Sequence, residues 1–180
     1  MSDVFKEYKI PFAGLRRETH EFDFVLDESF FANFENTLIR KCQVQVHVAL
    51  DKTQEPAVLE IDLDGTVWSD CDKCTASIPI AIHQSFTLFV KNTPADTDSE
   101  ADDVEEIIYL AKDDNEINLS QHLYEFAHLS IPVHVICDNP GKTDYCDQDI
   151  LQRLEGDTIN EESSDPRWAA LNKLKDKTPN

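Results

Sequence analysis

The most regular pattern of apolar and polar residues in the chain lies in residues 59–90. Apolar side chains alternate with polar ones over residues 59–67, and the same two-residue period returns over residues 78–90. Such alternation is typical of a β-strand with one buried and one solvated face. The two segments flank a short turn that contains Cys71 and Cys74. The pattern therefore predicts a long antiparallel hairpin that carries two cysteines at its tip.

Other segments also have strand character. Strands are predicted at residues 8–12, 20–26, 42–50 and 107–110. The clearest is the third, in which Cys42 lies on the apolar face and His47 on the polar face. We interpret Cys42 as a buried core thiol and His47 as an exposed residue.

Four helices are predicted from capping residues and helical spacing. Asp27 is placed to cap a short helix that ends near Asn36, and Asn118 is placed to cap a longer one, with Gln121 completing a capping box. The inner stripe of the longer helix consists of Leu119, Leu123, Phe126 and Ala127, and His122 and His128 are expected to be exposed. Two further short helices are expected at residues 150–154 and from Asp165 onward, where Pro166 would occupy the first helical position.

These elements together predict an α+β fold, with a mainly antiparallel, curved sheet, a long central hairpin and a few short helices. Residues 1–154 are predicted to form one domain, and residues 155–180 a polar linker followed by the C-terminal helix. Residues 92–106 are rich in Asp and Glu and are expected to form a solvated loop.

The charge of the chain narrows its possible partners. The sequence has 36 acidic and 16 basic side chains and a formal net charge of −20. Such a charge repels nucleic-acid phosphates at long range, so direct RNA contact would need a local basic patch, for which Arg16-Arg17, Arg40-Lys41 and the lysines near the C-terminus are candidates. The acidity suits a basic protein partner better, or simply keeps the chain soluble. No apolar run is long enough to span a membrane and the start lacks the pattern of a signal peptide, so we expect a cytoplasmic protein with reduced thiols.

Four of the five cysteines fall into two pairs, Cys71 with Cys74 and Cys137 with Cys146. A spacing of two residues lets both thiolates of a turn reach one metal ion, and Zn²⁺ prefers four ligands. The sequence therefore suggests one structural Zn²⁺ held by Cys71, Cys74, Cys137 and Cys146, with His134 as a spare ligand; reduced, unliganded cysteines are the alternative.

The same cysteines could serve a thiol oxidoreductase. That chemistry needs the first cysteine at a helix N-terminus, whereas Cys71 is predicted to lie between two strands. The chain also lacks a Gly-rich phosphate loop, an activated-serine elbow and a metal-binding pair of helical histidines, so no enzymatic activity and no catalytic residue are predicted.

Four motifs, in this order, resemble the YceD (DUF177) family, whose bacterial members are known as large ribosomal RNA subunit accumulation proteins. The motifs are Leu59–Val67 leading into Cys71-x-x-Cys74, Glu116-Ile117-Asn118-Leu119, Ile131-Pro132 leading to Cys137, and Asp165-Pro166-Arg167-Trp168 leading to Leu174. The resemblance implies a non-enzymatic role in the synthesis, processing or stability of large-subunit ribosomal RNA. It implies as partner a large-subunit assembly intermediate or a basic ribosomal protein. The alternative from the residues themselves is a zinc-stabilised acidic adaptor that binds a basic protein unrelated to ribosomes.

Overall fold

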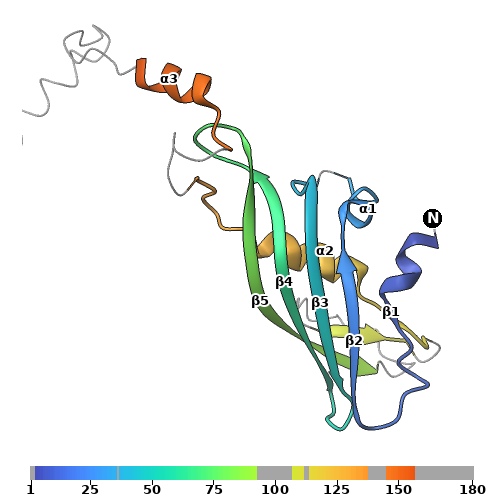
Figure 1. Cartoon of the computed structure of the whole chain (residues 1–180). Coiled ribbons are helices and arrows are strands. Elements are labelled where there is room, and N and C mark those ends of the chain that lie inside the picture. The colour runs from blue at the N-terminus through green and yellow to red at the C-terminus, as the bar shows by residue number, and fades with distance from the viewer. Residues whose placement is uncertain (1–2, 36, 93–106, 112–113, 138–144, 157–180) are drawn as a thin grey trace, which may run out of the picture.

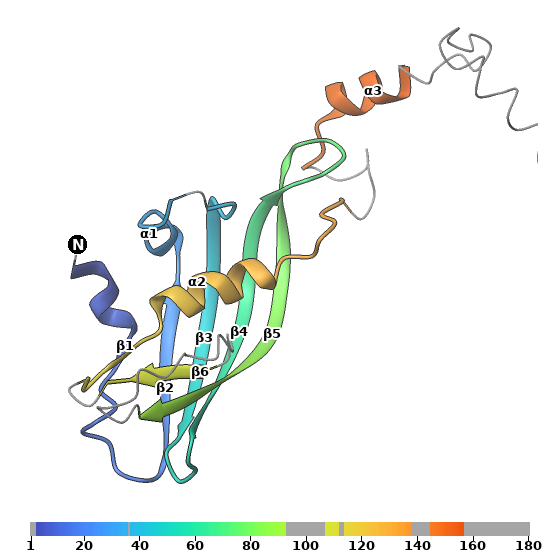
Figure 2. The same ribbon diagram turned by 180° about the vertical axis from the view of Figure 1, so that it is seen from behind.

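The computed structural model describes residues 3–35, 37–92, 107–111, 114–137 and 145–156 (Figure 1). Within these ranges the fold is α+β, as predicted: an open sheet of five strands carries helix α2 across one face, and Figure 2 shows α2 in front of the strands. The predicted loop over residues 92–106 and the predicted C-terminal helix from Asp165 fall almost entirely outside the described residues.

The sheet has the strand order β2-β3-β4-β5-β6. Its strands are β2 (Thr19–Leu26), β3 (Lys41–Asp51), β4 (Ala57–Asp70), β5 (Ser77–Asn92) and β6 (Ile107–Leu110). Neighbouring strands are antiparallel except β5 and β6, which are parallel. The predicted hairpin is confirmed: β4 pairs with β5 from Ala57 opposite Val90 to Asp70 opposite Ser77. It is the longest pairing in the sheet and carries the two cysteines of its tip beyond the other strands (Figure 1).

A second, two-stranded sheet joins the N-terminal region to the chain before α2. A 3₁₀ helix, η1 (Asp3–Tyr8), leads into β1 (Lys9–Ile10), which pairs with β7 (Ile117–Asn118). The strand predicted at residues 8–12 is thus shorter than expected. Tyr8 belongs to η1, and Pro11 has no N–H with which to continue the ladder.

The first predicted helix is also shorter than expected. Helix α1 covers Glu28–Phe31, and the Asp27 carboxylate accepts from the backbone N–H groups of Ser29 and Phe30, as its predicted role as N-cap requires. After Phe31 the backbone continues in tighter turns, in which the N–H of Phe34 donates to the carbonyl of Phe31 at 3.0 Å. The α-helical pattern therefore ends well before Asn36.

Helix α2 (Ser120–Leu129) begins later than the sequence suggests. Asn118 is the last residue of β7 and not the N-cap, although its side chain accepts from the N–H of Ser120 at 3.0 Å. The predicted capping box is wrong as well, because the Gln121 amide donates to Glu125 one turn ahead at 2.7 Å. The predicted inner stripe is confirmed, since Leu119, Leu123, Phe126 and Ala127 are all buried.

The two histidines of α2 were predicted to be exposed, but in the structure both are half-buried. His128 donates from Nδ1 to the Tyr124 carbonyl at 2.8 Å and accepts at Nε2 from the N–H of Leu38 at 3.3 Å. His122 is half-buried, and burial lowers its pKa. His128 differs from the prediction because residues 37–38 contact α2 away from the sheet.

The main core lies between the sheet and the helices. Buried residues of β3 and β4 alternate along each strand and face α1 and α2. Phe86 of β5 stacks on Phe126 of α2 with ring centres 4.1 Å apart and ring planes 2° from parallel. Cys42 is part of this core, as predicted. The alternation of apolar and polar residues in these strands therefore determines which face of the sheet the helices cover.

The last described element is α3 (Gln148–Gly156), which extends beyond the predicted helix at residues 150–154. Its Leu151 is buried in a second, smaller apolar cluster at the tip of the β4–β5 hairpin. The domain boundary at residue 154 remains a prediction. Among the described residues no helix is long and apolar enough to cross a membrane.

Candidate metal centre

The second apolar cluster contains three cysteines. Its buried members are Cys71, Cys74, Ile78, Val135, Cys137 and Leu151. They come from four parts of the chain: the β4–β5 turn, the start of β5, the segment after α2, and α3. The cluster therefore connects the far end of the sheet to the C-terminal part of the described chain.

The turn between β4 and β5 holds its own shape through backbone hydrogen bonds. The N–H of Cys71 donates to the Ala76 carbonyl and the N–H of Thr75 to the Cys71 carbonyl, each at 2.8 Å. Thr75 has a φ of 57°, in the left-handed region that β-branched residues rarely adopt. The N–H of Lys73 lies 3.4 Å from Cys71 Sγ and donates to it. The tight turn places Cys71 and Cys74 on the same side, with both sulfurs buried.

A pair of hydrogen bonds fastens this turn to the segment after α2. The N–H of Asp72 donates to the Val135 carbonyl at 2.7 Å, and the N–H of Val135 donates to Asp72 Oδ2 at 2.9 Å. Two residues beyond Val135, Cys137 then reaches the sulfurs of the turn. Val135 and Cys137 are buried, whereas Val133 and Ile136 are exposed.

The sulfur atoms converge on Cys137. Its Sγ lies 3.4 Å from that of Cys71, 3.6 Å from that of Cys74 and 3.2 Å from that of Cys146. The sulfurs of Cys71, Cys74 and Cys137 all lie within 4.8 Å of one another. All five cysteines of the chain are free thiols.

The pKa values of Cys71 and Cys137 are shifted in opposite directions. Burial raises the pKa of Cys71, but hydrogen bonds from the backbone N–H groups of Cys74, Lys73 and Cys137 and from the Cys137 thiol outweigh it, so the pKa falls from 9.0 to about 7. Burial and the hydrogen bonds to the three neighbouring thiols raise the pKa of Cys137. Without a metal, Cys71 therefore loses its proton more readily than Cys137. A divalent cation would favour deprotonation of the other thiols.

The sulfurs of Cys71, Cys74 and Cys137 lie close enough together to share one metal ion, whereas Cys146 is not part of the group within 4.8 Å of one another and would have to move to complete a tetrahedral site. Sulfurs bound at 2.3 Å to one tetrahedral zinc are separated by about 3.8 Å. The three separations measured from Cys137 are a few tenths of an ångström shorter, so a small outward movement of the sulfurs would admit an ion. A buried, all-sulfur ligand set selects zinc over magnesium or calcium.

The predicted ligands can now be compared with their positions. Cys71, Cys74 and Cys137 form the buried cluster, and Cys146 is half-buried beside Cys137. His134, the predicted spare ligand, is exposed, and the cluster that the described residues form includes no histidine. Cys42 lies in the main core. Two sequence pairs separated by more than sixty residues have therefore come together at one place.

The position of Cys71 can also be compared with what a thiol oxidoreductase requires. Cys71 follows directly after β4, in a turn between two strands, and no helix begins at Cys71 or Cys74. The pKa of about 7 comes from N–H groups of the turn and not from a helix dipole. Because Cys71 is almost wholly buried, a substrate disulfide could not approach its sulfur without opening the cluster.

One residue of this centre was missed by the sequence analysis. Asp72 binds no metal, but it connects the two halves of the cluster through Val135. The signal available in the sequence was an aspartate within a Cys-x-x-Cys turn, where a short carboxylate can reach backbone N–H groups. Its partner, 63 positions away, gave no local signal.

Fold and site define an α+β protein in which a cysteine cluster joins the tip of a long hairpin to the segment after the covering helix. The chain belongs to the family described as Large ribosomal RNA subunit accumulation protein YceD, which matches residues 59–175. The match begins in β4 and includes the hairpin, α2 and all four cysteines of the candidate centre. A search of curated proteins and a search of solved structures found no match.

Proposed function

We propose that this protein is a non-enzymatic ribosome-assembly factor that supports the synthesis, processing or stability of large-subunit (23S) ribosomal RNA in the cytoplasm. The observation that carries the proposal is the family match over residues 59–175. The region that matches the family model also contains the elements that build the cysteine cluster.

In this proposal the cysteines hold one structural Zn²⁺, with Cys71, Cys74, Cys137 and Cys146 as ligands. The support is geometric: three buried sulfurs within 4.8 Å of one another and a fourth 3.2 Å from Cys137. Zinc would join the hairpin tip to the segment after α2 and to α3, in addition to the small apolar cluster and the Asp72–Val135 hydrogen bonds. Its role would be to fix the shape of this end of the molecule.

The partner we propose is a large-subunit assembly intermediate, contacted through a basic ribosomal protein. Support comes from the net charge of −20 and from the outer face of the sheet, where acidic side chains of β2 and β4 are exposed. Asp23 of β2, Asp62 of β4 and Asp64 of β4 belong to this face. Two of these carboxylates accept from histidines, Asp23 from His47 and Asp64 from His83, each at 2.9 Å.

The experiment that tests the function measures the ratio of large-subunit to small-subunit ribosomal RNA in cells depleted of the protein, beside a sucrose-gradient profile. We expect the large RNA to fall selectively and the protein to migrate with immature large subunits. Restoration by the intact chain is the control. An unchanged ratio, with no co-migration, would contradict the proposal.

That contrary outcome would favour a second candidate, a zinc-stabilised acidic adaptor for a basic protein unrelated to ribosomes. The observation behind it is again the excess of acidic side chains, 36 against 16 basic ones. Affinity purification separates the two candidates. Ribosomal proteins among the captured partners support the first, and a single basic protein without ribosomal components supports the second.

A further inference from the structure

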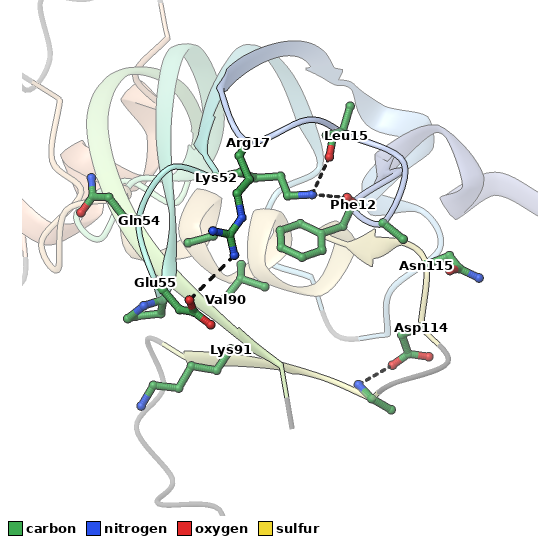
Figure 3. A pocket seen from close by; sticks show the side chains of 14 residues that line it. Phe12, Leu15, Arg17, Lys52, Gln54, Glu55, Val90, Lys91, Asp114 and Asn115 are labelled. Atoms are coloured by element: carbon green, nitrogen blue, oxygen red, sulfur yellow. Dashed lines mark hydrogen bonds and ion pairs between the residues drawn. The ribbon is translucent and has the colours of Figure 1, made fainter. Parts of the chain in front are cut away.

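A cavity of about 740 Å³ lies at the opposite end of β4 from the cysteine cluster (Figure 3). Its walls come from the β1–β2 connection, the β3–β4 turn, the end of β5 and the segment between β6 and β7. Cavities that bind small molecules measure about 300–1,000 Å³. This one is therefore large enough for a ligand of nucleotide size.

Lys52, at the start of the β3–β4 turn, holds its ammonium group at the wall of this cavity. Nζ donates to the carbonyl oxygens of Phe12 at 2.6 Å and Leu15 at 2.9 Å, and lies 4.2 Å from the centre of the Phe12 ring (Figure 3). These contacts position the charge without neutralising it, and within the described ranges Lys52 forms no ion pair. Burial and the neighbouring Arg17 guanidinium both lower the pKa of Lys52, so two cations lie close together here.

The other charged groups leave this positive charge largely uncompensated. Arg17 lies 3.9 Å from Glu55, but the two side chains are 81% and 88% exposed, and such a pair contributes little in water. Asp114 accepts from the N–H of Ala111 at 3.1 Å. Lys91 of β5 also belongs to the lining, but it is exposed and its side chain extends away from Arg17 and Lys52 (Figure 3). In a chain with a net charge of −20, a cavity that brings Arg17 and Lys52 together beside two carboxylates is far less negative than the chain as a whole.

Apolar side chains lie beside these cations. Phe12, Leu15 and Val90 line the same cavity, each of them partly or fully buried. A ligand that suits this lining has an anionic group for the cations and a flat, weakly polar part for the apolar wall. A nucleotide has both, and proteins that bind single-stranded RNA combine basic side chains with apolar or aromatic surfaces in this way.

We propose that this cavity binds a phosphate and its attached nucleoside in single-stranded RNA, through Arg17 and Lys52. The proposal rests on the proposed function for the source of the ligand, since a factor for large-subunit ribosomal RNA meets unpaired RNA segments. It assigns Arg17, one of the basic residues noted in the sequence, to a site. Because the rest of the chain repels phosphates, binding depends on this cavity and weakens steeply with salt.

The test is fluorescence anisotropy of the full-length protein with a labelled oligouridylate of about ten nucleotides, at about 50 mM salt and upward. We expect Arg17→Glu to weaken binding about tenfold and to reduce the slope of log affinity against log salt by about one. Inorganic phosphate and adenosine monophosphate serve as unlabelled competitors.

Arg40→Glu is the matched control. Like Arg17, Arg40 is an exposed arginine in a long ion pair, 3.7 Å from Asp70 and with its side chain 78% exposed, but it lies at the other end of the sheet. We expect it to leave RNA affinity within about twofold of the unmodified chain. If Arg17→Glu and Arg40→Glu weakened RNA binding equally, the cavity would not be the binding site, because affinity would then follow the total charge alone.

Two further outcomes would also overturn the proposal. One is the absence of any binding to the oligouridylate at low salt. The other is displacement of the bound oligonucleotide by adenosine monophosphate at a lower concentration than unlabelled oligouridylate requires, which would assign the cavity to a free nucleotide. The proposed function is tested separately. If the Arg17→Glu variant restores large-subunit RNA in depleted cells, the proposed function stands, although RNA binding by the cavity is not needed for it. If depletion leaves the RNA ratio unchanged while the cavity binds RNA, the function fails and the cavity stands.

Discussion

Asp72 and Val135 are joined by two hydrogen bonds, one from each backbone N–H, across 63 positions of sequence. One of the two uses the Asp72 carboxylate as acceptor and the other uses the backbone of both residues. This connection sets the distance between the hairpin tip and Cys137, so it controls whether the cysteine cluster can form. It acts on the proposed metal site without supplying a ligand.

Replacing Asp72 with alanine is therefore expected to damage the centre. The N–H of Val135, a buried residue, would lose its acceptor, and the free energy of unfolding should fall by about 1–3 kcal/mol. Zinc affinity should fall by about ten- to a hundredfold, measured by competition with a chromophoric chelator. Asp70→Ala is the matched control, since Asp70 is an exposed carboxylate on the other side of Cys71. Equal effects of both variants would mean that charge, and not the contact with Val135, is responsible.

The ligand set predicts which cysteines retain zinc. Protein purified without added metal should carry about one equivalent of zinc by elemental analysis. Cys71→Ser, Cys74→Ser and Cys137→Ser should each abolish retention, because a tetrahedral thiolate site tolerates the loss of a ligand poorly. Cys146→Ser should only lower it, because Cys146 is half-buried and lies outside the group of three sulfurs within 4.8 Å of one another. An intact chain without metal would contradict the proposed centre while leaving the family assignment unaffected.

Cys42→Ala supplies the internal control for that series. Cys42 is buried like the cluster cysteines, but it lies in the main core, where its thiol donates to the Leu26 carbonyl at 3.5 Å. This variant should keep its full zinc content and lose some stability, by about 1 kcal/mol, from the small cavity. Loss of zinc here would show that metal retention reports on general folding and not on the four ligands.

Much of the sheet could be predicted from sequence because its strands alternate strictly. The β4–β5 hairpin, β3 and the inward position of Cys42 follow from a period of two residues, which any strand with one buried face must show. The pairing of Cys71 with Cys74 followed from their spacing. What brings Cys137 to them did not, because the Asp72–Val135 contact depends on where α2 ends and on how the next segment crosses the hairpin.

The helices were harder to predict. Asn118 has the properties of an N-cap, but β7 pairs it with Lys9 and delays the start of α2. His128 was expected to be solvated, yet its Nε2 accepts from Leu38, in a segment that passes over the helix. In both cases a distant part of the chain overrode a local preference. The cavity around Lys52 had no sequence signal, because its walls come from four separate segments.

The pKa of Cys71 predicts a pH effect in the metal-free chain. The folded-state pKa, about 7, lies below the ordinary value of 9.0, so the folded state binds fewer protons between these values. Stability from this group is therefore full above about pH 9 and is lost as the pH falls through about 7. The raised pKa of Cys137 acts oppositely, and its contribution is lost as the pH rises above its ordinary range. Ultraviolet absorbance of the thiolate should show one group titrating near neutral pH.

Cys71→Ser is the control for this titration. It should remove the step near pH 7 and leave the alkaline thiol titration in place. Urea unfolding of the metal-free chain should show stability increasing from neutral to mildly alkaline pH, and the serine variant should lack that increase. A first titration step near the ordinary thiol value would show that the N–H groups of the turn do not stabilise a thiolate.

The last prediction concerns Gly65, at the middle of β4 and opposite Val44 of β3. A Cβ atom at Gly65 would lie 2.2 Å from the Gln43 carbonyl oxygen and 2.7 Å from Val44 Cα, and both are backbone atoms that cannot move without breaking the ladder. Gly65→Ala should therefore lower the free energy of unfolding by about 3 kcal/mol or more, measured by urea denaturation. Gly14→Ala, where nothing lies within 4 Å of the added atom, should be close to neutral. Because β4 carries Cys71 at its end, Gly65→Ala should also lower zinc retention in proportion to the fraction unfolded. If it instead left stability unchanged, the close approach of β3 and β4 at this position would be wrong. The register that places Cys71 and Cys74 at the hairpin tip would then be wrong as well.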